Sequence, residues 1–307
     1  MSDFPWRCGA NFLPSTAANQ LEMWQADTFD PATIDRELGW ARKIGMRLMR
    51  VFLHDLAWLA DPEGLKARFA RYLEIAAAHG IATMPVFFDD CSKTPFLAAG
   101  KQPEPRPFVH NSCWIQSPGD QAHADPAAWG RLRDYVADVI GAFGRDPRVV
   151  LWDLYNEPGN LKGDAARDDN SLDLVEAVFA WARAAAPTQP LTCGPWDFSP
   201  RFDALNRYLI ANSDVVSFHC YERPDVLRER INHLRRAAAG RPLVCSEYMA
   251  RTNGSTFAEC LPILKENDVS AVNWGLVSGR TNTIYPWGWG PEKGRPETDI
   301  YVSRKQA

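Results

Sequence analysis

Short apolar runs alternate with longer amphipathic stretches along this chain of 307 residues. Eight of the runs are rich in β-branched or other apolar side chains, as expected of strands that are buried on both faces. The eight predicted strands are Arg7–Phe12, Arg47–Leu53, Ala82–Phe88, Val149–Tyr155, Leu191–Pro195, Val215–Cys220, Leu243–Tyr248 and Ala271–Leu276.

The stretches between these runs have helical periodicity. The first, Asp30–Gly45, places Ile34 and Leu38 on one stripe, behind an Asp30 cap and with Pro31 at the first helical position. The other predicted helices are Asp61–Gly80, one that opens at Asp125-Pro126, Leu172–Ala186, Pro200–Asn212, Pro224–Gly240, Thr256–Asn267, and an eighth in the tail after Arg295.

Eight strands that each precede a helix predict an α/β fold, the (β/α)8 TIM barrel, as a single domain over residues 1–307 with long βα loops after strands 3 and 8. The rival is a doubly wound open sheet, which would need a glycine-rich phosphate loop after its first strand. Asn11 is followed by Phe-Leu-Pro-Ser-Thr instead, and the chain has no GxGxxG or Walker pattern. The barrel is therefore the preferred prediction.

Composition and charge exclude several classes of protein. Hydrophobic residues make up 46% and charged residues 23%, which is typical of a folded globular chain. The net charge of −4 and the lack of an apolar run of about 20 residues argue against nucleic-acid and membrane partners, and no oligomeric state is indicated. Seven cysteines without a CxxC pair, and a start without a secretion signal, predict reduced thiols in a cytoplasmic protein.

Two glutamates are the leading candidates for chemistry. In a barrel the active site lies at the carboxyl ends of the strands, where Glu157 ends strand 4 and Glu247 ends strand 7. Because these strands are three apart in a ring of eight, the two carboxylates should face each other across one scissile bond. Arg50 and Tyr221 near Glu247 would favour its charged form and suit it to act as the nucleophile, which leaves Glu157 as the acid/base.

Other polar or aromatic side chains fall at the same predicted rim. The further candidates for substrate binding there are His54, Asp89, Asn156, Trp196, His219 and Trp274. Twelve tryptophans in the chain also suggest an aromatic groove. The structural alternatives are that Asn-Glu-Pro is simply a turn, that Arg50 forms an ion pair at the barrel bottom, and that His219 and Trp274 pack in the core.

Four segments resemble retaining glycoside hydrolases of the clan A barrels, and family 5, the cellulase-like family, is the most similar. They are WDLYNEP at 152–158, SFHCY at 217–221, CSEYM at 245–249 and NWG at 273–275. The resemblance implies that Glu157 is the acid/base, Glu247 the nucleophile and Asn156 the ligand of the sugar 2-hydroxyl. It also implies that Arg50 and Tyr221 are partners of the nucleophile, that His219 lines the site, that Trp274 is the sugar platform, and that no metal or organic cofactor is needed.

The resemblance to the family is incomplete at the end of strand 3, and two long loops resemble those of a subgroup. Family members usually carry a histidine near the end of strand 3, where this chain has Phe87-Phe88-Asp89-Asp90. The loop with His110-Asn111-Ser112-Cys113-Trp114 and the stretch 275–289 after strand 8 look characteristic of a cellulase- or xylanase-like subgroup. Loops of this kind that close one end of the cleft predict an exo-acting enzyme on terminal sugars or short glycosides, with Asn111, Trp114 and Trp287 as further substrate-binding residues.

Several alternatives stay open at this point. The enzyme alternatives are an endo-acting cellulase, xylanase or mannanase and an arabinofuranosidase or galactofuranosidase. The non-enzyme alternative is a glycan-binding barrel without catalysis. A metal-dependent barrel hydrolase would use ligands among His54, Asp55, Asp89, Asp90 and His219, but the chain has neither an HxH after strand 1 nor an HExxH motif.

Overall fold

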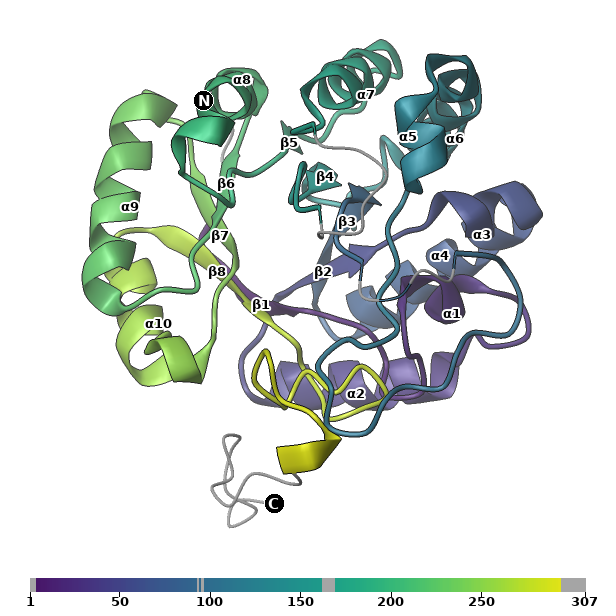
Figure 1. Ribbon diagram of the computed structural model, residues 1–307, viewed down its shortest axis with the longest axis horizontal. Coiled ribbons are helices and arrows are strands. Elements are labelled where there is room, and N and C mark those ends of the chain that lie inside the picture. Colours follow the sequence, from purple (N-terminus) through teal and green to yellow (C-terminus); the bar gives the residue numbers. More distant parts are fainter. Residues whose placement is uncertain (1–3, 93, 95–96, 162–168, 294–307) are drawn as a thin grey trace.

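Eight parallel strands curl into a barrel with helices on the outside in the computed structural model (Figure 1). The structure describes residues 4–92, 94, 97–161 and 169–293. The strands are β1 (Cys8–Asn11), β2 (Leu48–Phe52), β3 (Ala82–Asp89), β4 (Trp152–Asn156), β5 (Leu191–Thr192), β6 (Val216–His219), β7 (Leu243–Glu247) and β8 (Val269–Trp274). The predicted (β/α)8 barrel is confirmed, and each predicted strand contains most or all of an observed one.

The helices largely follow the amphipathic pattern. They are α1 (Gln20–Trp24), α2 (Pro31–Lys43), α3 (Asp55–Ala60), α4 (Pro62–Ala78), α5 (Asp120–Ala124), α6 (Trp129–Phe143), α7 (Leu172–Ala184), α8 (Asp203–Asn212), α9 (Pro224–Ala238) and α10 (Phe257–Glu266). Short 3₁₀ turns at Pro126–Ala128 and Pro200–Phe202 precede α6 and α8, where the pattern predicted a continuous helix. The helix predicted after Arg295 lies outside the described residues.

The predicted helix cap at Asp30 is observed, and Asp61 caps the next long helix in the same way. Asp30 Oδ1 accepts a hydrogen bond of 3.0 Å from the Thr33 N–H at the start of α2, and Asp61 Oδ1 accepts one of 2.9 Å from the Gly64 N–H at the start of α4. Each side chain satisfies a backbone donor that has no partner within the helix. These caps fix where the two helices begin.

The barrel closes by a seam between β5 and β6. The strands pair in the order β5-β4-β3-β2-β1-β8-β7-β6, and among the described residues the first and last strands share no ladder. Single backbone bonds join them instead, from the Asp214 N–H to the Leu191 carbonyl (2.8 Å) and from the His219 N–H to the Pro195 carbonyl (3.0 Å). A Cβ atom at Gly194 would lie 2.7 to 3.0 Å from Ser217, so only glycine allows this approach.

The barrel interior is apolar near its amino end and polar above. A buried layer of aliphatic and methionine side chains fills the lower interior: Leu48, Met84, Leu151, Val215, Val244 and Val272. Because side chains alternate along a strand, Arg50 lies on the same side of β2 as Leu48 but closer to the carboxyl end of the barrel. The apolar layer therefore supports the polar groups from below.

The long loops after β3 and β8 lie side by side at the carboxyl end, as Figure 1 shows in blue-teal and yellow. The Asn111 N–H donates to the Thr281 carbonyl (2.7 Å), and Asn282 Nδ2 donates to the Arg106 carbonyl (3.0 Å). These bonds join the two loops into one wall beside the mouth of the barrel.

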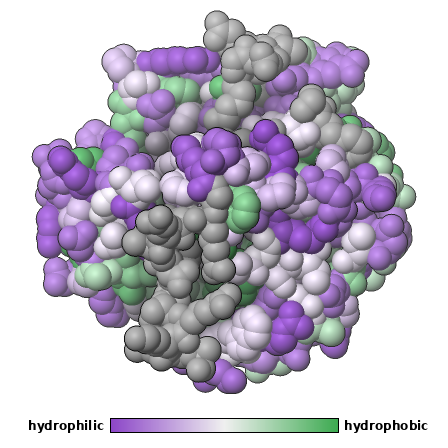
Figure 2. Space-filling model, turned by 60° about the horizontal axis from the view of Figure 1, so that its bottom comes forward, coloured by the Kyte–Doolittle hydropathy of each residue, from purple (hydrophilic) through white to green (hydrophobic). Residues whose placement is uncertain are grey.

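The outer surface is mainly hydrophilic on the face that Figure 2 turns forward, where hydrophobic residues form small separate patches. Among the residues that the structure describes, the helices are all too short or too polar to cross a lipid bilayer.

Candidate active site

A cavity of about 790 Å³ opens at the carboxyl end of the barrel. Ten of the residues predicted from the sequence line it: Asn111, Trp114, Asn156, Glu157, Trp196, His219, Tyr221, Glu247, Trp274 and Trp287. The remaining three, Arg50, His54 and Asp89, do not line it and are placed below.

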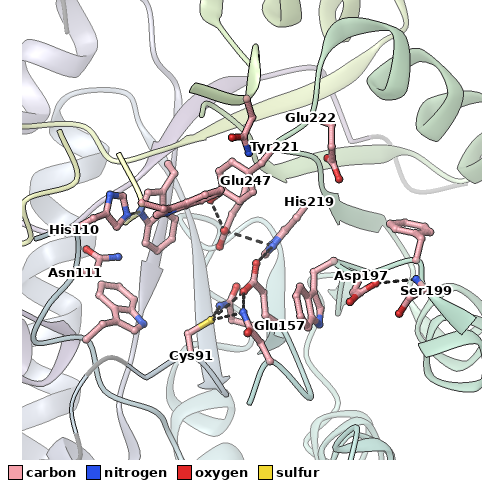
Figure 3. A pocket seen from close by; sticks show the side chains of 18 of the residues that line it. Cys91, His110, Asn111, Glu157, Asp197, Ser199, His219, Tyr221, Glu222 and Glu247 are labelled. Carbon is pink, nitrogen blue, oxygen red and sulfur yellow. Dashed lines mark hydrogen bonds and ion pairs between the residues drawn. The ribbon is translucent and has the colours of Figure 1, made fainter. Parts of the chain in front are cut away.

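The carboxylates of Glu157 and Glu247 lie next to each other in this cavity (Figure 3). One oxygen of each and a ring nitrogen of His219 are all within 4.8 Å of one another. His219 Nδ1 is 2.8 Å from Glu157 Oε1 and 3.5 Å from Glu247 Oε2. A separation of this size leaves room for a sugar carbon between the carboxylates, whereas a mechanism with an intervening water needs about 6.5–9.5 Å.

Arg50 lies below Glu247 as a buried four-way connection. Its Nη1 donates to Glu247 Oε1 (2.7 Å) and Asn11 Oδ1 (2.8 Å), its Nη2 to Asn156 Oδ1 (2.7 Å) and its Nε to Asp153 Oδ2 (2.8 Å). The guanidinium donors are thus engaged with these four side chains, and the guanidinium supports the cavity from below.

The two carboxylates have opposite pKa shifts. Burial raises the pKa of Glu247, against the charges of His219 and Arg50 and the Tyr221 hydroxyl, which donates to Oε2 over 2.6 Å. Burial alone would also raise the pKa of Glu157, but donors from His219, Cys91 and Asn160 outweigh it and lower the pKa to about 2. The sequence predicted the opposite charge order from Arg50 and Tyr221, because it did not show that His219 lies closer to Glu157.

Asp89 lies below the cavity and fixes Asn156. Its Oδ1 accepts from Asn156 Nδ2 (2.9 Å) and its Oδ2 from Trp114 Nε1 (2.7 Å). Burial raises the pKa of Asp89 to about 8, against these donors. Asp89 therefore does not line the cavity, and it supports two residues that do.

His54 is a helix-capping residue instead of a site residue. Its Nδ1 accepts from the Leu56 N–H (3.1 Å) at the start of α3, and its Nε2 donates to the Gln116 carbonyl (3.1 Å). The side chain is fully buried. The sequence placed it at the rim because α3, which begins directly after β2, is too short to leave a periodic pattern.

Aromatic side chains form one end of the cavity. Trp274, at the end of β8, donates its indole N–H to His110 Nε2 (3.1 Å), and His110 Nδ1 donates in turn to the Tyr285 carbonyl (2.8 Å). Trp274 also packs edge-to-face on Trp114, with 5.4 Å between the ring centroids. Trp287 packs in the same way on Tyr221, with 4.7 Å between centroids. The β3 and β8 loops therefore place His110, Trp114 and Trp287 around Trp274 and Tyr221 at this end.

The opposite end of the cavity is formed by the segment after β5 and by α9. Trp196 donates its indole N–H to the Pro158 carbonyl (2.9 Å). The Arg230 guanidinium lies 3.3 Å from the centroid of the Phe198 ring, and its Nε is buried without a hydrogen-bond partner in the described part of the chain. This end thus offers aromatic faces and the Arg230 guanidinium.

Cys91, Asn160 and Arg230 line the cavity but were not predicted as site residues. Cys91 follows the strand-3 end by two residues, and Asn160 follows Glu157 by three, so a wider search around the strand ends could have found both. The backbone of Glu157 has a φ of 44°. This left-handed turn after β4, which brings Asn160 back to Glu157, has no signature in the residue types. Arg230 lies on α9, away from the strand ends, so the strand-end pattern did not indicate it.

Three side chains of the site could ligate a metal ion. Glu157, His219 and Glu247 each offer one ligand atom, but here the His219 N–H already lies between the two carboxylates. The ligands predicted for a metal-dependent hydrolase do not converge on one point. Asp55 pairs with Arg131 (2.7 Å), and Asp90 accepts from the Tyr155 hydroxyl (2.8 Å).

Comparisons with known proteins agree with this geometry. A family described as Cellulase (glycosyl hydrolase family 5) matches residues 109–279, more than half of the chain. No curated protein matches the sequence.

Three solved structures illustrate the likeness in fold. The endo-β-1,4-mannanase of Thermotoga petrophila has a TM-score of 0.61 at 13% identity, over 90% of this chain and 69% of that one. The β-mannanase of the blue mussel Mytilus edulis has a TM-score of 0.64 at 14% identity, over 91% and 90%. The exo-β-1,4-mannosidase of Opitutaceae bacterium strain TAV5 has a TM-score of 0.63 at 16% identity, over 92% and 56%. The chain therefore belongs to glycosyl hydrolase family 5 and is a glycoside hydrolase.

Proposed function

We propose that this protein is an exo-acting retaining glycosidase that removes the terminal sugar from short oligosaccharides or glycosides. The observation that carries the proposal is the pair of carboxylates within 4.8 Å, in a cavity with a wall of two joined loops at one end. A polymer chain would have to pass through that wall, whereas a terminal sugar fits in front of it.

Glu247 acts as the nucleophile in this proposal. One of its oxygens attacks the anomeric carbon while the bond from that carbon to the leaving oxygen breaks, and Glu157 gives its proton to the leaving oxygen. Water then enters, Glu157 takes a proton from it, and the water oxygen displaces Glu247 from the sugar. The two inversions together retain the configuration.

The surrounding donors support this division of roles. Arg50 and Tyr221 hold both oxygens of Glu247, which orients the attacking carboxylate. Asn156 is fixed by Arg50 and Asp89 and is available to the sugar 2-hydroxyl. Glu157 must carry a proton when the bond breaks, and the His219 N–H, 2.8 Å from its Oε1, keeps a proton within one hydrogen bond of it.

The two ends of the cavity suit the two halves of the substrate. The terminal sugar stacks on Trp274 at the closed end, and the leaving group extends past Glu157 toward Trp196 and Arg230. An aromatic face beside a guanidinium suits a hydroxyl-bearing leaving group such as a second sugar. Because one structural neighbour is an exo-β-1,4-mannosidase, β-mannosides are the first substrates to test.

The test is turnover of a panel of 4-nitrophenyl glycosides, furanosides included, by purified protein. Glu157→Gln and Glu247→Ala should each reduce kcat/KM by about 10³-fold or more, since each removes a group that reacts. Azide should rescue Glu157→Gln through a product of retained configuration, and Glu247→Ala through one of inverted configuration.

Other outcomes would overturn the proposal. Unchanged turnover in both variants would remove the catalytic assignment and favour a glycan-binding barrel. Faster cleavage of internal bonds in polymeric cellulose, xylan or mannan than of small aryl glycosides would replace the exo mode by an endo mode. Preference for furanosides would assign the enzyme to arabinofuranose or galactofuranose.

A further inference from the structure

We propose that Cys91 is a positioning residue for the acid/base: its thiol donates to Oε2 of Glu157 and, with Asn160 and His219, fixes the plane of that carboxyl group. This inference rests on the proposed function, in which Glu157 is the acid/base. It assigns a role to a residue that neither the strand-end pattern nor the family motifs single out.

The contacts around Cys91 leave its thiol proton with a carboxylate acceptor. Cys91 Sγ is 3.0 Å from Glu157 Oε2, and Asn160 Nδ2 is 3.3 Å from the same sulfur. Because the side-chain amide of Asn160 donates a hydrogen bond to the sulfur, the sulfur is an acceptor there. The thiol S–H is then left to donate a hydrogen bond to Glu157. The Cys91 N–H donates to Asp89 Oδ1 (2.8 Å), which fixes the backbone that carries the thiol.

The donors to Glu157 come from different directions. His219 donates to Oε1, while Cys91 and Asn160 both donate to Oε2. Figure 3 shows Glu157 between Cys91 and His219. Donors on both oxygens prevent rotation of the carboxyl group, so it stays directed at the leaving oxygen.

A thiol suits this position because it is a weak donor. It holds Oε2 without favouring the anion as strongly as a hydroxyl would, and the acid must regain a proton in each turnover. Burial and the neighbouring charge of Glu157 raise the pKa of the Cys91 thiol, so it remains a donor. Cys113 is a suitable comparison, since its thiol donates to the Pro103 carbonyl (3.3 Å) and lines no part of the cavity.

The test is the pH profile of kcat/KM for Cys91→Ala, Cys91→Ser and Cys113→Ala. The active form has Glu157 protonated and Glu247 ionised, and Glu157 has the lower pKa of the two, so the pKa of Glu157 sets the acidic limb of the profile. Loss of a donor to the anion raises that pKa, and Cys91→Ala should move the acidic limb up by about 0.5–1 pH unit, the effect of one hydrogen bond. Cys91→Ser should keep the limb at or below the wild-type position, and Cys113→Ala should leave it unchanged.

Two results distinguish this inference from the proposed function. If Glu157→Gln abolishes turnover but Cys91→Ala lowers kcat without moving the limb, the residue is merely structural and only this inference fails. If Glu157→Gln retains turnover, the proposed function itself fails.

A second measurement does not depend on activity or on folding of the cysteine variants. Iodoacetamide labelling of each cysteine is followed by mass spectrometry in wild type and in Glu157→Gln. Removal of the negative charge beside the thiol should speed labelling of Cys91 at least threefold and leave Cys113 unchanged. Equal rates at Cys91 would show that the contact does not form in solution and would overturn the inference.

Discussion

Single residues in this site act through shared neighbours. Arg50 is 1% exposed and contacts two carboxylates and two asparagine side-chain oxygens, so one cation balances Glu247 and Asp153 and orients Asn156. Removal of one partner from a buried ion pair leaves the other charge uncompensated. Arg50 therefore contributes both to the stability of the fold and to the arrangement of the site.

Arg50→Met is expected to lower the free energy of unfolding by about 3–5 kcal/mol, because Asp153 and Glu247 would remain buried without the guanidinium that pairs with both. Urea denaturation followed by tryptophan fluorescence measures the loss. Arg133→Met is the control, since Arg133 pairs with Asp134 on the surface, and it should change stability by less than about 0.5 kcal/mol. A loss for Arg50→Met no larger than that of the control would contradict this view of the site.

His219 determines the pH range of activity in the proposed mechanism. Its hydrogen bond and charge oppose burial and lower the pKa of Glu157, so the protonated acid is lost as pH rises and kcat/KM should be higher at pH 5 than at pH 8. In His219→Ala burial dominates and the pKa of Glu157 rises, so the limb that Glu157 sets, the acidic one in the wild type, should move up by at least about one pH unit while kcat falls. A pH–rate profile with an unmoved limb would show that another group controls it.

At the scale of elements, the strand ends were predictable and the segments between them only in part. Continuous apolar runs located the eight strands, which are buried on both faces, and the 3.6-residue period located the longer helices, which bury one face. The helices α1, α3 and α5 are five or six residues long and leave no periodic stripe. The same limit hid the capping role of His54, which depends on α3.

Contacts between distant segments were not predictable from residue types. The loops after β3 and β8 were expected to cover the cleft, but their pairing through Asn111 and Thr281 depends on register in space. The contact of Cys91 with Glu157 likewise follows from two loops that meet. Strand order could place Glu157 opposite Glu247, because parallel strands end at one edge.

The wall formed by the β3 and β8 loops is expected to hold the sugar platform. In His110→Ala the Trp274 indole loses its acceptor and the loops lose one bond, so kcat/KM for an aryl glycoside should fall about tenfold, the effect of one hydrogen bond. Steady-state kinetics measure the change. Glu104→Ala is the matched control in the same loop, because the exposed Glu104 pairs only with Arg280 among the described residues. An equal effect in both variants would mean that the platform does not depend on His110.

At the scale of the whole molecule, the barrel is one sheet whose two outer strands meet at the seam between β5 and β6. Residue pairs align along the ladder from β2 to β3 at five positions, whereas separate backbone bonds and side-chain bonds, such as that between Thr192 Oγ1 and Ser217 Oγ (2.8 Å), join the seam. Local opening is easier where fewer backbone hydrogen bonds must break. We therefore expect the seam to open more readily than the β2–β3 ladder.

Hydrogen–deuterium exchange should reveal this difference. Peptides that cover residues 190–199 and 213–219 should take up deuterium faster than peptides that cover 48–53 and 82–88, because the latter lie within a continuous ladder. Mass spectrometry of a time course measures both sets in one sample. Equal protection would indicate that packing, instead of the ladder, controls opening.

The close approach at Gly194 has a consequence for a cell that makes this protein. When the seam separates, two unpaired strand edges become available at once, and bare edges recruit strands from other molecules. A side chain at position 194 would hold the seam apart against Ser217. Gly194→Ala should therefore yield insoluble aggregates, and the soluble fraction of the protein should fall before a loss of catalytic activity can be measured.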